Sequence, residues 1–154
     1  MSANSIQIAV IKTNIINALK LLEWTPTGNA QPTKFQDVFN FVNMSDDVGS
    51  PFACVVDEQP RITNKSLKAS FYGKETPIAV YVLSNFAKLK GSEAETRNIF
   101  AYEAVESYLC KAENMEAAGL PSYEYMGWVP VRNELNTIKG RILRIKTLSR
   151  VQIN

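Results

Sequence analysis

The sequence predicts an α+β fold, with a mainly antiparallel sheet and two helices packed on one face of it. Two observations lead to this prediction. In two long segments the apolar residues recur at steps of three and four, as in amphipathic helices, whereas in several shorter segments they alternate or form short runs, as in strands. The helical segments do not alternate regularly with the strands, so a doubly wound parallel sheet is not expected.

The first helix is expected over residues 6–23. Asn4 or Ser5 can cap its start, and the segment Trp24–Pro26 ends it. Polar residues occupy the side that faces solvent, and the apolar side consists of Ile8, Ile11, Ile15, Ala18, Leu19 and Leu22. Because this stripe is long and aliphatic, the helix is expected to pack on the sheet.

Three strands are expected to follow a loop at residues 25–34. Phe35–Val42 alternates with period two, and Phe52–Val56 is a short buried strand opposite it. Ile78–Leu83, preceded by Pro77, is rich in β-branched and aromatic residues, which favours a strand. The polar stretch Asp57–Lys68 between them is expected to be an exposed excursion.

The second helix is expected to begin at a capping box, Ser92–Glu95, and to extend to about Glu116 before Gly119 ends it. An aromatic strand, Tyr123–Val131, follows, then a turn, and the last strand runs from Gly140 to the end. No repeat or long linker divides the chain, so residues 1–154 are expected to form a single domain.

The composition argues against catalysis. The chain has no histidine, and histidine is the commonest general base near neutral pH and a common zinc ligand. Triads that need a histidine are excluded, so we expect no enzyme and no cofactor, although a carboxylate or tyrosine mechanism stays open as an alternative. No metal is expected either, because the acidic residues Asp46, Asp47, Asp57 and Glu58 lack the spacing of an oxygen-ligand site.

The cysteines and the chain ends indicate synthesis in the cytosol. Cys54 and Cys110 are expected to be buried free thiols. The first residues do not resemble a signal peptide, and no apolar run is long enough to cross a membrane.

Two local patterns have a functional and a structural interpretation. Glu103 and Glu106 lie one helical turn apart, as a catalytic carboxylate pair would, but such pairs are typical of a solvated helix face. Tyr123, Tyr125 and Trp128 could stack on bases, whereas core packing or a subunit interface explains them equally well.

The C-terminal strand has an unusual pattern of charge. One face reads Leu143, Ile145, Thr147 and Val151, and the other reads Arg144, Lys146 and Arg150. Lys139 and Arg141 add positive charge at the start of the strand. Two interpretations are open: a half-exposed strand whose charges discourage aggregation, and a functional basic surface.

The order of the elements resembles the tail-terminator and tail-completion proteins of long-tailed bacteriophages. The resemblance rests on the helix Ile8–Leu22, the strands up to Pro77–Leu83, the helix Ser92–Glu116 and the two closing strands. Proteins of this group are small α+β subunits that form hexameric rings and cap the tail tube at the end nearest the head. The resemblance therefore implies a structural virion protein that terminates the tail or joins it to the head.

Several expectations follow from this resemblance. The chain would bind copies of itself in a ring, expected to be a hexamer, and would contact the tail tube protein and neck or connector proteins. The excursion with Arg61, Lys65 and Lys68 would reach a neighbouring subunit or the tube. The basic strand would face the lumen, where DNA passes transiently, or an acidic partner. The protein would be found in the host cytoplasm during assembly and then in the tail of the virion.

An alternative from another class is a small nucleic-acid-binding module. It would use the basic C-terminal strand together with the tyrosines, and its binding would weaken steeply with salt, because each phosphate contact releases counterions.

Overall fold

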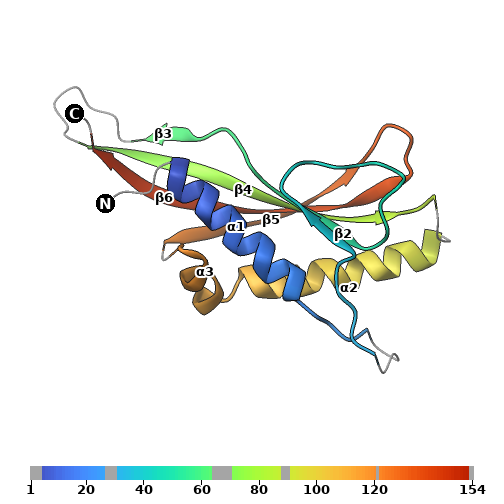
Figure 1. Cartoon of the computed structure of the whole chain (residues 1–154). Coiled ribbons are helices and arrows are strands. Elements are labelled where there is room, and N and C mark those ends of the chain that lie inside the picture. Colours follow the sequence, from blue (N-terminus) through green and yellow to red (C-terminus); the bar gives the residue numbers. More distant parts are fainter. Residues whose placement is uncertain (1–4, 27–30, 64–70, 88–90, 121, 153–154) are drawn as a thin grey trace.

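The structure is a computed structural model that describes residues 5–26, 31–63, 71–87, 91–120 and 122–152. Within these ranges the chain forms three helices and one six-stranded sheet (Figure 1). The sheet is mixed but mostly antiparallel, which confirms the predicted α+β class. Lys65 and Lys68, two of the predicted interface residues, lie outside the described residues.

The sheet is built around two long strands that pair along their whole length. β4 (Phe71–Asn85) and β6 (Ile138–Gln152) are antiparallel, with Phe71 opposite Gln152 and Asn85 opposite Ile138. At roughly 3.3 Å per residue each strand spans about 50 Å, so the sheet sets the long axis of the molecule. The strand order is β1-β2-β4-β6-β5, so β1 and β5 are its two edges.

The shorter strands flank this pair. β2 (Phe52–Asp57) and β3 (Arg61–Thr63) both pair antiparallel with β4, and β5 (Tyr123–Arg132) pairs antiparallel with β6. The excursion predicted from Asp57 to Lys68 is therefore partly a strand, since its residues at β3 join the sheet. Pro77 is tolerated inside β4 because it lies opposite the break between β2 and β3.

The strand predicted over Phe35–Val42 is much shorter in the structure. β1 (Asp37–Phe39) has three residues and pairs parallel with β2, whereas the pattern predicted a longer strand. The chain turns away after Phe39, and the following segment folds over the other face of the sheet, where Val48 and Met44 pack on Phe52 and its neighbours.

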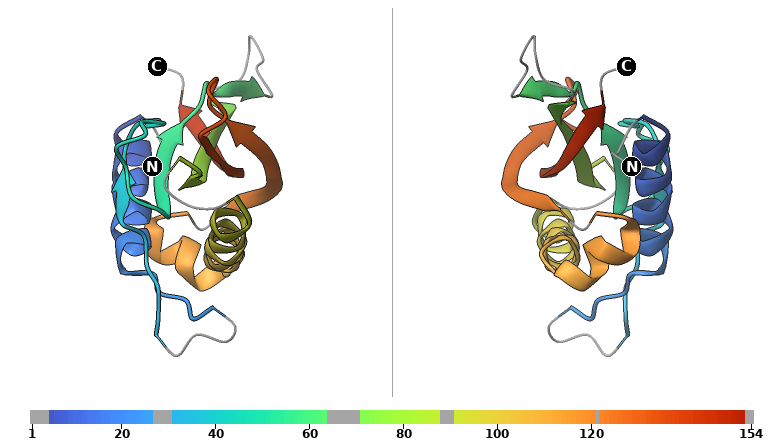
Figure 2. Two further views of the ribbon diagram at one scale, coloured as in Figure 1. Left: turned by 90° about the vertical axis from the view of Figure 1, so that its right-hand side faces the viewer. Right: turned by 90° about the vertical axis from the view of Figure 1, so that its left-hand side faces the viewer.

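All three helices lie on the same face of the sheet, as Figure 2 shows in views along the strands. α1 (Ser5–Leu21), α2 (Gly91–Leu109) and α3 (Ala112–Ala118) bury one apolar cluster against β2, β4 and β6. Its largest fully buried members include Ile15, Leu19, Ile78, Leu109, Met115, Leu143 and Ile145. The prediction of helices on one face is confirmed, with a third helix added to the two expected.

The predicted second helix is in fact two helices. α2 ends at Leu109, and the Asn114 side chain donates a hydrogen bond of 3.1 Å to the Tyr108 carbonyl, which a continuing helix would have used. α3 ends at Ala118, and Gly119 stops it as predicted, because Gly119 adopts φ 98° and the amides of Gly119 and Leu120 bond the Glu116 and Met115 carbonyls.

Candidate functional site

The predicted basic strip on β6 is neutralised by glutamates. The Arg144 guanidinium donates to both carboxylate oxygens of Glu58, at 2.7 and 3.1 Å. The Lys146 ammonium lies 3.7 Å from Glu75 and 3.3 Å from Glu124. These two cations therefore face three carboxylates, and this part of the sheet presents no excess of positive charge.

Two other predicted cations fall elsewhere. Arg150 lies in β6 opposite Gly73, but its side chain is outside the described part of the structure. Arg61 is exposed on β3. Within the described part of the chain, neither residue forms a cluster with Arg144 and Lys146.

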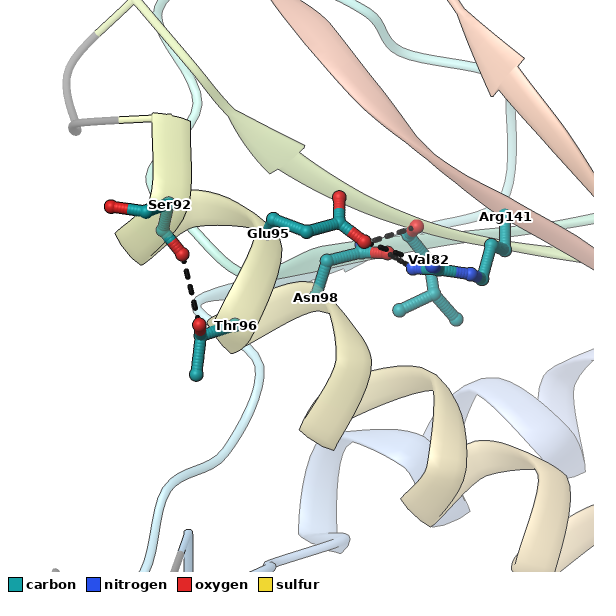
Figure 3. A network of polar contacts seen from close by, with 6 residues as sticks. All are labelled: Val82, Ser92, Glu95, Thr96, Asn98 and Arg141. Atoms are coloured by element: carbon teal, nitrogen blue, oxygen red, sulfur yellow. Dashed lines mark hydrogen bonds and ion pairs between the residues drawn. The ribbon is translucent and has the colours of Figure 1, made fainter.

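Arg141 faces the helices, although its place at the start of a basic strand predicts a surface charge. Its guanidinium donates 2.6 Å to the Asn98 side-chain oxygen and 2.9 Å to a Glu95 carboxylate oxygen (Figure 3). The Asn98 amide in turn donates 2.9 Å to the buried Val82 carbonyl. The Arg141 side chain is only 15% exposed and is paired with Glu95. This network therefore holds α2 on the sheet, and Arg141 is not a free positive charge.

The capping box predicted at the start of α2 is used differently. The Glu95 carboxylate binds Arg141 on β6, and the Ser92 carbonyl accepts a 2.9 Å hydrogen bond from the Thr96 hydroxyl one turn later (Figure 3). Glu95 therefore joins the helix to the sheet.

A β-bulge at Met126 and Gly127 sets the direction of the aromatic side chains on β5. Tyr125 is opposite Ile145 and Trp128 is opposite Leu143, so β5 has one residue more than β6 between these pairs. Gly127 has φ 84° there, which favours glycine. Without the extra residue Trp128 would point to the opposite face; with it, Trp128 joins Tyr123 and Tyr125 on the side of the helices.

Tyr123 and Tyr125 are partly buried against the helix layer, which favours the core-packing interpretation over base stacking. The Tyr125 hydroxyl donates a 2.5 Å hydrogen bond to Glu106 on α2. Burial, helped by the negative charge of Glu106, raises the pKa of Tyr125 above that of a free tyrosine. Glu106 is thus a partner of β5, while Glu103 is exposed, and the two do not act as a carboxylate pair.

A basic groove lies at the end of the β5–β6 hairpin. Arg132 and Lys139 are opposite each other in the two strands, although like charges in this position destabilise a sheet. Among the described residues neither forms an ion pair: Arg132 contacts Asn136 at 3.5 Å, and the Lys139 ammonium lies 4.6 Å from the centre of the Phe86 ring. The groove has a volume of about 480 Å³.

The walls of this groove are partly aromatic and apolar. Trp128 and Pro130 line it from β5. Arg141 lines it from β6 and is paired with Glu95, which lines it from α2. The Trp128 ring is 41% exposed and packs 5.5 Å from Tyr102 and 4.9 Å from the Arg141 guanidinium, so its orientation is fixed. The groove therefore combines two cations and a rigid aromatic surface, which suits an acidic partner with some apolar area.

The edge of the sheet beside the groove is also apolar. β5 has no strand on its outer side within the described residues, and large apolar side chains are exposed along it and in the turn that follows. These are Met126 at 51%, Val129 at 45% and Leu135 at 75%. A free edge of this kind is a template for contact with another chain.

Another groove, of about 530 Å³, lies between Trp24, Pro51 and the start of α2. Its charged residues, Glu93 and Arg97, pair with each other at 2.9 Å. The segment that lines it continues into residues 27–30, which the structure does not describe. This groove therefore supports no ligand assignment.

The acidic residues considered for a metal are separate in the structure. Lys12 binds Asp57, Arg144 binds Glu58, and the Thr137 hydroxyl donates to Asp46. In the part of the chain that is described, no three side chains of metal-ligating type lie close enough to share an ion. Of the two thiols, Cys54 is buried as predicted, but Cys110 is exposed, because it lies in the turn between α2 and α3.

No protein-family model matches the sequence, and no curated protein is significantly similar to it. No helix within the described ranges is long and apolar enough to cross a membrane.

Arg132 was missed as a site residue in the sequence analysis. The turn at residues 133–136 was predicted, and a hairpin closing there puts Arg132 opposite Lys139, so the pair could have been found by counting outward from the turn. The direction of Arg141 could also have been predicted, because Arg141 is two and four residues from Leu143 and Ile145 and therefore points to the same face of the strand.

Proposed function

We propose that this chain is a structural assembly subunit, a ring-forming tail terminator or head–tail joining protein of a long-tailed bacteriophage. The observation that supports this best is the surface at β5, where exposed Met126, Trp128 and Val129 follow a free sheet edge beside the basic groove. Exposed apolar side chains grouped with fixed charges are typical of protein interfaces. The order of the elements, on which the resemblance rests, supports the same class.

The ring in this proposal needs a contact between two unlike surfaces of the chain. The strands at the two ends of the sheet order are unlike, since β1 has three residues and β5 has ten. Contact between unlike surfaces is heterologous, and heterologous contacts close into a ring when the rotation between copies divides a full turn. The ring proposed from the resemblance is a hexamer that binds the tail tube and the neck proteins.

The nucleic-acid alternative is less well supported by the contacts. It requires free cations on the C-terminal strand, whereas Arg141, Arg144 and Lys146 are bound to glutamates. Among the described side chains of this strand, Lys139 is the one cation without an ion pair. Tyr123 and Tyr125, which would stack on bases, pack against the helices. The proposal keeps only a transient, non-specific contact with DNA as the DNA passes through the lumen of the ring.

Size-exclusion chromatography with light scattering tests this function. We expect a single species whose mass is a small multiple of 17.2 kDa, six copies in the simplest case, and binding to the ends of purified tail tubes. A chain that stays monomeric at high concentration, and also in the presence of tail tubes, would overturn the proposal. Binding to duplex DNA that weakens steeply with salt would favour the alternative.

A pair of matched variants locates the interface. Val129→Glu places a charge on the β5 edge, and Val10→Glu places one on α1, where the valine is 54% exposed. The proposal predicts that Val129→Glu weakens assembly and that Val10→Glu leaves it close to the wild type. Equal effects of the two variants would remove β5 from the interface.

A further inference from the structure

The far end of the molecule from the basic groove carries an acidic surface. α3 lies beside the start of β5, and the hairpin turn lies at the other end of that strand (Figure 1). Because β5 has ten residues, the two ends are about 30 Å apart. Glu113 and Glu116 lie one turn apart on α3, and both are exposed.

These two glutamates are not held in ion pairs within the described subunit. Among the described residues neither Glu113 nor Glu116 forms an ion pair, and like charges at this spacing weaken a helix. Exposed Ala112 and Ala117 flank them, so the side chains next to the carboxylates are small. Lys111, at the start of α3, is the nearest basic residue in sequence.

Each end therefore carries two like charges without an ion pair, positive at the groove and negative on α3. Arg132 and Lys139 oppose each other across two strands, and Glu113 and Glu116 oppose each other along a helix. Each pair costs stability in an isolated subunit, and each would be neutralised by contact with the other. Within one chain they cannot meet, because β5 separates them.

We infer that α3 of one copy docks in the basic groove of the next, with Glu113 and Glu116 against Arg132 and Lys139 and with Trp128 as the apolar wall. This inference rests on the proposed ring function and names its subunit contact. The contact is head to tail, because the groove and α3 are different surfaces of the same chain. Repeated around an axis, it closes a ring in which every groove and every α3 is occupied.

Two charge-reversal variants test the contact. The groove variant carries Arg132→Glu and Lys139→Glu, and the helix variant carries Glu113→Lys and Glu116→Lys. Each variant alone brings like charges together at every contact, so its assembly should be weakened at least about tenfold. A control with Lys20→Glu and Lys34→Glu changes the net charge as much as the groove variant does at exposed positions away from the groove, and should assemble like the wild type.

Mixing the two variants gives the decisive result. An acidic groove from one chain matches a basic α3 from the other, and the reverse contact matches as well, so an equimolar mixture should assemble. Native mass spectrometry should show equal numbers of the two chains, which must alternate and so require an even number of copies, as a hexamer has. A chain with all four substitutions should assemble alone.

The outcomes separate this inference from the proposed function. If the wild type forms a ring, and the folded groove variant and helix variant each form a ring alone, the proposed contact is wrong and the proposed function stands. If the groove variant forms rings but no longer binds tail tubes, the groove holds another protein and the inference is overturned. A mixture that stays monomeric while the wild type assembles also contradicts it. A monomeric wild type would remove both proposals. Thermal unfolding of each variant shows that it is folded.

Discussion

The Arg141 guanidinium lies 4.3 Å from the centre of the Tyr102 ring, and this contact joins β6 to α2. The guanidinium also lies 4.9 Å from the centre of the Trp128 ring, which packs beside the Tyr102 ring. Its hydrogen bonds to Glu95 and Asn98 complete the attachment of the helix. One side chain of β6 thus positions both α2 and the aromatic wall of the basic groove.

Replacement of Arg141 by lysine should destabilise the fold by about 2 kcal/mol. Lysine keeps the charge but lacks the planar guanidinium that bonds both Glu95 and Asn98 and packs against the two rings. Arg97→Lys is the matched control: its pair with Glu93 on α2 is about half exposed, so the cost should stay below about 0.5 kcal/mol. Urea unfolding measures both. Equal free energies of unfolding for the two variants would contradict this role of Arg141.

Gly140 should not accept a side chain. A Cβ there would collide with the Val82 carbonyl oxygen and lie 2.9 Å from the Asn98 amide nitrogen, so it would break the bond between them. Gly140→Ala is expected to cost at least about 3 kcal/mol. Gly91→Ala, where nothing lies within 4 Å, should be neutral or slightly stabilising. Thermal unfolding of the two alanine variants gives the comparison, and similar melting temperatures would refute the argument.

Tyr125 should make the fold sensitive to alkaline pH. Its pKa is raised in the folded chain by burial and by Glu106, so the unfolded chain ionises first, near the ordinary value of 10.0. The stabilising contribution is complete below that pH and is lost as the pH rises above it. The melting temperature of the wild type should exceed that of Tyr125→Phe at pH 8, and the difference should shrink above about pH 10. A difference that stays constant across this range would show that Tyr125 ionises equally in both states.

The two thiols should react at very different rates. Cys110 is exposed and Cys54 is fully buried, so a thiol-specific reagent should modify one group per folded chain and the second only after unfolding. Partial desolvation of the sulfur and the charge of Glu106 raise the pKa of Cys110, so the rate should increase as the pH rises. Cys110→Ser should lack the fast reaction. Modification of both thiols at one rate in the native protein would contradict the burial of Cys54.

The elements that could be predicted from the sequence are those with strong periodicity. α1 begins within a residue of its predicted start and ends two residues early, because its aliphatic stripe repeats without interruption. β4 contains the predicted strand Ile78–Leu83 but extends beyond it at both ends, where polar residues conceal the pairing with β6. The common face of the helices followed from the order of the elements.

The features that could not be predicted depend on contacts that no periodic pattern in the sequence shows. Arg144 and Glu58 are 86 residues apart, so no local pattern shows that the basic strip is neutralised. The break between α2 and α3 depends on Asn114 bonding the Tyr108 carbonyl. The parallel pairing of β1 depends on the path of the segment after it. The bulge at Gly127 is a one-residue change of register that redirects Trp128.

Disulfide cross-linking between two singly substituted chains tests the central claim, head-to-tail assembly through the groove and α3, most directly. In a Cys110→Ser background, one chain carries Lys139→Cys and the other carries Glu116→Cys. After mixing and mild oxidation we expect disulfide-linked pairs that contain one chain of each kind. Links between two Lys139→Cys chains would show a two-fold contact, and an absence of mixed pairs in an assembled ring would contradict the account.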